Sequence, residues 1–96
     1  MKLLLCTYCG DVRKLRSAEA VECQCGRSKG RYLSDGLHSI VSGETARVVG
    51  LDNHTLTTAV RTDRKTNEPG IDVISFLFPI GHKRAETVSA DDRRLQ

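Results

Sequence analysis

The sequence predicts a small α+β protein, and three features of the chain support this prediction. All four cysteines lie in two pairs near the start of the chain, and a glycine directly follows each pair. The middle of the chain holds two short segments rich in β-branched residues, which favour strands. One later stretch carries apolar residues at helical spacing. We therefore expect an N-terminal four-cysteine module packed with a small antiparallel β-sheet and one short helix.

The cysteine pairs have the spacing of a metal site. They occur as Cys6-Thr7-Tyr8-Cys9-Gly10 and Cys23-Gln24-Cys25-Gly26. A tight turn brings two thiolates onto one ion, and the glycine allows a positive φ without a clash at Cβ. Thirteen residues separate the two pairs, which suits two turns that face each other across one tetrahedral ion. We predict that the metal ligands are Cys6, Cys9, Cys23 and Cys25.

Four thiolate ligands predict a structural metal rather than a catalytic one. They fill a tetrahedron around Zn²⁺ and leave no position for water or substrate. Iron remains an alternative, since a tetrahedron of thiolates accepts either metal. Two disulfides in an oxidising compartment are a second alternative. The third is a redox dithiol of the glutaredoxin type, which requires a helix that opens at Cys9, where Gly10 and Val12 follow instead.

The two cysteine motifs resemble the zinc-ribbon superfamily, over about the first third of the chain. This resemblance implies two knuckles on a small antiparallel sheet, with structural Zn²⁺ between them. The second pair departs from the usual pattern, because one residue rather than two separates its cysteines. The stretch from Cys25 to Gly36 also looks like a group of small uncharacterised bacterial and phage proteins, a likeness that implies no particular activity. Zinc ribbons serve in transcription, ribosomes and protein adaptors, so the fold does not fix the function.

Short apolar runs predict the strands of the cysteine module and a hairpin beyond it. The runs next to the cysteines cover residues 2–5, 11–15, 21–22 and 32–33. Residues 37–42 and 46–51 flank the polar, glycine-containing connection at 42–45, which is the pattern of a β-hairpin. Leu56, Ala59 and Val60 then predict a helix over residues 54–62, capped by Asp52 or Asn53.

The last third of the chain predicts one more strand and a charged tail. The sequence Asn67-Glu68-Pro69-Gly70 specifies a type II turn. The following run from Ile71 to Ile80 is apolar on both faces, which is typical of a central strand or of an edge strand covered by another subunit. We therefore consider a homo-oligomer through Ile71 to Phe78. These patterns divide the chain into a zinc-ribbon module (1–31), a β-rich domain with the helix (32–81) and a charged segment (82–96) that forms either a flexible tail or a loosely held helix.

The positive charge of the chain gathers near the cysteines. The formal net charge is +3, and four thiolates with one divalent ion lower it to +1. Seven of the 15 basic residues lie within the first 31 positions, where they can offset the negative metal centre. The alternative is a contact with phosphate groups of nucleic acid or nucleotides, and its best candidates are Arg27, Lys29 and Arg31.

The sequence favours a binding protein over an enzyme. The three histidines are isolated from one another, and no nucleophile, base and orienting group can be named together. No apolar run approaches the roughly 20 residues of a membrane span, and the free cysteines fit a reducing compartment, so we expect a cytoplasmic protein. A protein partner is the first hypothesis and nucleic acid the second.

Overall fold

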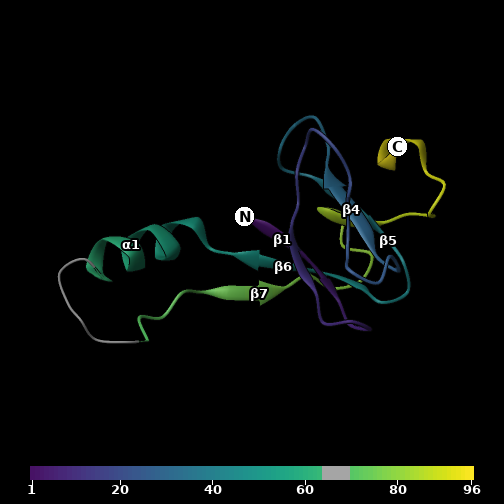
Figure 1. Cartoon of the computed structure of the whole chain (residues 1–96). Coiled ribbons are helices and arrows are strands. Elements are labelled where there is room, and N and C mark those ends of the chain that lie inside the picture. Colours follow the sequence, from purple (N-terminus) through teal and green to yellow (C-terminus); the bar gives the residue numbers. More distant parts are fainter. Residues whose placement is uncertain (64–69) are drawn as a thin grey trace.

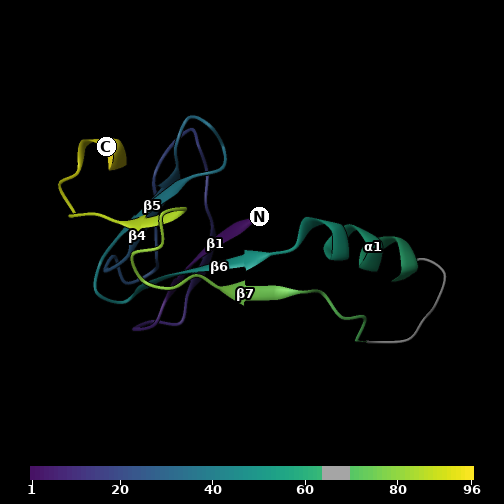
Figure 2. The same cartoon turned by 180° about the vertical axis from the view of Figure 1, so that it is seen from behind.

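The computed structural model describes residues 1–63 and 70–96, and these residues form two four-stranded sheets and two helices. The first sheet has the order β2-β1-β6-β7 and the second the order β3-β4-β5-β8. The α+β prediction is confirmed (Figures 1 and 2). The first sheet contains β1 (Lys2–Cys6), β2 (Val12–Lys14), β6 (Ala46–Leu51) and β7 (Ser75–Leu77). The second contains β3 (Val21–Glu22), β4 (Lys29–Tyr32), β5 (Ser39–Ser42) and β8 (Ala85–Thr87). The helices are α1 (Asn53–Asp63) and a 3₁₀-helix, η1 (Arg93–Leu95).

The strands before and after the first cysteine pair and before the second form close to the expected runs, whereas β4 lies at Lys29–Tyr32 and thus begins before the run expected at 32–33. β1 and β2 pair antiparallel, with Leu3 opposite Lys14 and Leu5 opposite Val12. β3 and β4 pair antiparallel around the second turn. Each cysteine pair therefore lies in the turn of its own short hairpin, and the two hairpins belong to different sheets.

The hairpin predicted from residues 37–51 is wrong. β5 and β6 both form, but β5 pairs with β4 and β8, whereas β6 pairs with β1 and β7. The turn between them contains Gly43, whose φ of 111° is closed to most side chains. A Cβ at this position would lie 2.1 Å from the carbonyl oxygen of Arg27. Because the turn packs against the second cysteine hairpin, it sends the chain from one sheet to the other.

The core lies between the two sheets. Its buried members are Leu4 of β1, Val41 of β5 and Val48 of β6, together with Leu15, Ala46 and Ala85. Few of these side chains are large, so the packed core is small for a chain of 96 residues. A core of this size makes any further link between the sheets important for stability.

The helix α1 begins one residue before and ends one residue after the predicted range. The Asp52 carboxylate accepts a hydrogen bond from the Thr55 N–H at 3.0 Å, which confirms the cap at Asp52. Figures 1 and 2 show α1 and the ends of β6 and β7 next to it extending away from the two sheets. We call this extension, residues 52–63 and 70–77, the arm. The molecule is accordingly elongated, with extents of 47 × 29 × 23 Å.

The strand predicted from Ile71 to Ile80 is shorter, and it lies at an edge. β7 covers only Ser75–Leu77 and is the terminal strand of the first sheet, so the central-strand alternative is wrong. Its side chains remain accessible, and Leu77 is 52% exposed. The turn predicted at residues 67–70 falls mostly outside the described residues.

The segment 82–96 differs from the predicted flexible tail. β8 adds to the second sheet in parallel with β5, and Ser39 lies opposite Ala85. The 3₁₀-helix η1 then places Leu95 in the interior, where it is only 1% exposed. The segment has few apolar residues, but Ala85 near its start and Leu95 near its end are both buried.

The boundary expected at residue 31 does not separate two bodies of structure. β1 pairs along its full length with β6, and β4 pairs with β5, so both sheets combine strands from both sides of the boundary. Among the described residues, no helix has the length and apolar character needed to cross a membrane.

Candidate metal centre

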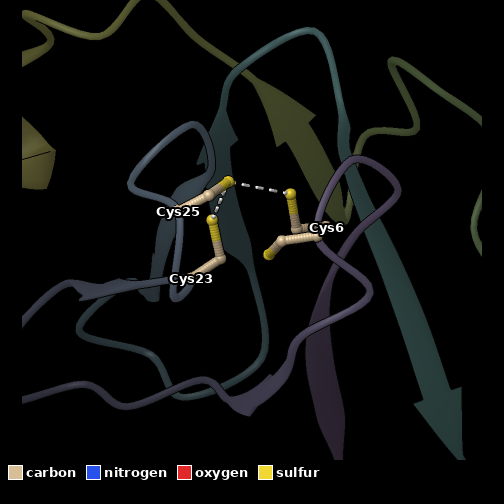
Figure 3. A group of neighbouring side chains, drawn as sticks. Cys6, Cys23 and Cys25 are labelled. Atoms are coloured by element: carbon tan, nitrogen blue, oxygen red, sulfur yellow. Dashed lines mark hydrogen bonds between the residues drawn. The ribbon is translucent and has the colours of Figure 1, made fainter.

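Four cysteines from the two hairpins meet at one end of the sheets. Cys6 is the last residue of β1, and Cys9 lies in the turn before β2. Cys23 follows β3 directly, and Cys25 lies in the turn before β4. Figure 3 shows Cys23 and Cys25 facing Cys6 from the opposite turn.

The distances between the sulfurs fit one tetrahedral ion. All four Sγ atoms lie within 4.8 Å of one another. The Cys6 and Cys25 sulfurs are 3.7 Å apart, and those of Cys23 and Cys25 are 3.4 Å apart. A Zn–S bond of about 2.3 Å in a tetrahedron separates the sulfurs by about 3.8 Å. No pair is joined in a disulfide, and these four predicted residues do come together.

The glycine after each pair adopts the backbone conformation that the motif requires. Gly10 has a φ of 75° and Gly26 a φ of 78°. The Gly10 N–H donates to the Cys6 carbonyl at 2.8 Å, and the Gly26 N–H donates to the Cys23 carbonyl at 3.0 Å. The second turn closes in the same way as the first, although it has one residue fewer between its cysteines.

Thr45 and Ser28 lie next to the sulfurs, and the sequence analysis identified neither residue. The Thr45 Oγ1 lies 3.5 Å from the Cys6 Sγ and 3.1 Å from the Ser28 Oγ. The Ser28 N–H donates to the Cys23 Sγ at 3.3 Å, and Ser28 is completely buried. Thr45 belongs to the turn between β5 and β6, so no local pattern next to the cysteines could have revealed it.

The surroundings of the cysteines give their thiols different pKa values. Hydrogen bonds from the Ser28 and Thr45 hydroxyls lower the pKa of the Cys6 thiol to about 5. The Arg27 N–H lowers the pKa of Cys25, but partial desolvation and the three neighbouring sulfurs outweigh it and raise this pKa to about 12. Thiolates crowded together in this way repel one another, and a cation between them removes the repulsion.

Asp11 and Arg13 link the two cysteine turns. The Asp11 carboxylate accepts hydrogen bonds from the Gln24 N–H at 2.8 Å and from the Arg13 Nε at 2.7 Å. Asp11, followed by the sulfurs of Cys23 and Cys9, raises the pKa of Arg13. Arg13 is thus one of the basic residues that offset the negative charge of this centre.

The three predicted phosphate contacts do not converge on one point. The Arg27 guanidinium stacks over the Tyr8 ring, 4.0 Å from its centroid, at the tip of the cysteine turns. Lys29 lies 3.9 Å from a Glu22 carboxylate oxygen. The Arg31 side chain donates to the backbone carbonyls of residues 17 and 32. Whether they contact phosphate stays a prediction.

A centre of this kind can hold a metal ion and link the two sheets. Cys6 ends a strand of the first sheet, whereas Cys23 and Cys25 flank the turn of a hairpin in the second. One ion bound to both hairpins therefore forms a cross-link at the end of the small core. β2, rather than a helix, follows Cys9, so the geometry lacks the helix N-terminus that a glutaredoxin-like dithiol requires.

Comparison with protein families, with curated proteins and with solved structures found no match.

Proposed function

We propose that this chain is a non-enzymatic binding protein of the zinc-ribbon type. Structural Zn²⁺ held by Cys6, Cys9, Cys23 and Cys25 joins the two sheets into one rigid body. The arm then offers an apolar surface to a protein partner, and the protein acts as an adaptor. The observation that carries this proposal is the four-sulfur cluster between the two hairpins.

The choice of zinc rests on the ligands. Four thiolates are soft donors that select zinc or iron over magnesium and calcium, and a closed tetrahedron is typical of structural zinc. Structural zinc contributes roughly 10–16 kcal/mol of apparent binding energy in small domains. That amount is comparable with the whole stability of a typical domain, roughly 5–15 kcal/mol.

Elemental analysis of the reduced, purified chain tests the metal directly. We expect one zinc ion for each chain, and a strong chelator should abolish the cooperative thermal transition. A metal-free protein whose circular dichroism and melting temperature do not respond to zinc or chelator would refute this part of the proposal. If the analysis finds one iron ion for each chain, the metal is iron rather than zinc, and its structural role is unchanged.

The protein partner is supported by the surface that the fold leaves uncovered. The arm exposes large apolar side chains, among them those of Val60, Ile74 and Leu77. Apolar surface of this kind is typical of interaction sites.

Site-specific photo-crosslinking in the native host tests this docking surface. A photoreactive residue at Leu77 or Val60 should yield one dominant protein adduct. The same residue at Arg93, which lies in η1 on the other side of the molecule, is the control. Equal adducts from all three positions, or none from the arm, would refute the protein partner, and an adduct of twice the chain mass would identify the partner as a second copy.

A further inference from the structure

A groove of about 450 Å³ lies between the first sheet and two loops, one that precedes β5 and one that precedes β8. Gly50 of β6 and Phe76 of β7 line it together with Phe78, which follows β7. Lys83 and Arg84 line the opposite side. A second hollow of about 400 Å³ adjoins it and shares four of these residues, Phe76, Phe78, Lys83 and Arg84. The two hollows together form an extended site that the metal centre does not use.

The Phe76 ring is a fixed and accessible platform within this site. A Cβ on Gly50 would lie 2.3 Å from the ring, so the ring rests directly on the backbone of β6. The Phe78 ring meets it edge to face, with 5.2 Å between the centroids. Phe76 nevertheless remains 48% exposed. A side chain that is held in place on two sides and still half accessible is well suited to stack on a flat ligand.

The charge of the site is positive. Lys2, Lys83 and Arg84 line the groove, and none of the described residues that line it is acidic. The Lys2 ammonium donates to the carbonyls of Leu37 and Arg84, and it lies 5.2 Å from the Phe78 centroid. It therefore adds a buried positive charge next to the Phe78 ring. Lys83 and Arg84 are exposed, so their side chains can reach an anion in the groove.

We propose that this groove binds single-stranded nucleic acid, with a base on Phe76 and phosphates on Lys83 and Arg84. Nucleic acid carries a flat aromatic group and a negative charge in every repeat, and the groove offers both complements side by side. A duplex keeps the faces of its bases stacked inside, so only a single strand can use the platform. An acidic peptide matches the charge but not the stacking surface. The proposal goes beyond the adaptor function, because it gives the protein a second ligand at a site away from the cysteine turns.

Fluorescence anisotropy with a labelled oligothymidylate of about 12 nucleotides tests the proposal, since this length lies within the usual range of such sites. We expect binding that weakens steeply with salt. The double variant K83A/R84A should lower the slope of log affinity against log salt by about 1.4, because each phosphate contact in a single strand contributes about 0.7. The variant R93A also removes an exposed positive charge, and it should leave the slope and the affinity unchanged.

Variants of Phe76 separate stacking from charge. F76L keeps an apolar side chain on Gly50 but loses the ring, and we expect affinity to fall about 10-fold, within the usual range for one stacked base. F76Y keeps the ring and should bind like the natural protein. Melting curves with zinc bound show whether each variant is folded.

Four results would overturn the proposal. The first is an absence of binding in low salt, and the second is an unchanged affinity of F76L. The third is displacement of the oligonucleotide by oligoglutamate at equal charge concentration, which would make the groove a site for acidic peptides. The fourth is loss of binding in R27A but not in K83A/R84A, which would move the contact to the second cysteine turn. None of these results affects the metal.

Discussion

Replacement of Thr45 by valine tests how the fold holds the metal centre. The hydroxyl of Thr45 lies 3.5 Å from the Cys6 sulfur and 3.1 Å from the Ser28 hydroxyl. Valine has nearly the same shape, so the substitution removes these contacts and little else. A hydrogen bond to a charged group contributes about 1.5–3 kcal/mol. This amount corresponds to a loss of about 13- to 160-fold in metal affinity, which overlaps the range of about 10- to 100-fold found for other groups that support metal ligands.

The assay is competition for Zn²⁺ against a chromophoric chelator at neutral pH, repeated with Co²⁺ so that its absorption reports four sulfur ligands. Thr7→Val is the matched control. The Thr7 hydroxyl donates to the Thr45 carbonyl at 3.1 Å and forms no hydrogen bond to a sulfur. If Thr45→Val and Thr7→Val bind zinc equally well, the hydroxyl network does not support the ligands, and Thr45 matters only for packing.

Three further predictions concern the parts of the fold that sequence patterns described poorly. Gly43→Ala should lower the melting temperature more than Gly36→Ala does. Both glycines have a positive φ, but of the two only Gly43 would place the added Cβ against backbone, at 2.1 Å from an oxygen. Equal losses would show that this turn does not pack as described. Leu95→Ala should cost about 2–5 kcal/mol in urea unfolding, as for other buried leucines, whereas a loss no larger than that of the exposed Leu37→Ala would mean that η1 is not anchored. The pKa of the Asp35 carboxyl is lowered to about 2 by the two N–H groups and the imidazole that it binds. The stabilising effect of this carboxylate should therefore be complete above about pH 4 and should vanish as the pH falls through about 2. A carboxyl carbon of Asp35 that titrates near pH 4 in NMR would contradict this prediction.

The two cysteine turns were predictable because the information that specifies them is local. Two cysteines, a short spacer and a glycine specify a turn whose geometry depends on a few neighbouring residues, and both turns form with glycine at positive φ. The same holds for the helix, where Asp52 caps a segment with apolar residues at helical spacing. In each case the residues that determine the local structure lie close together in the sequence.

The pairing of the strands was not predictable in this way. A polar connection that contains Gly43 has the length of a hairpin turn, yet its backbone packs against the second cysteine turn and the flanking strands join different sheets. The terminal segment has the composition of a tail, but two apolar residues fit gaps that the rest of the chain leaves. Both outcomes depend on contacts between residues far apart in the sequence.

By itself, therefore, the sequence determined the two cysteine turns, the four sulfurs that could hold a metal ion, the helix α1 and the α+β class. Only the tertiary structure decided that the two turns close the ends of different sheets, that Thr45 and Ser28 support the sulfurs, and that Phe76 lies exposed beside Lys83 and Arg84. The physical reason is the separation along the sequence over which each kind of interaction acts. Turn and helix preferences act over a few residues, whereas the free energy of pairing strands and closing a small core depends on which distant surfaces fit together.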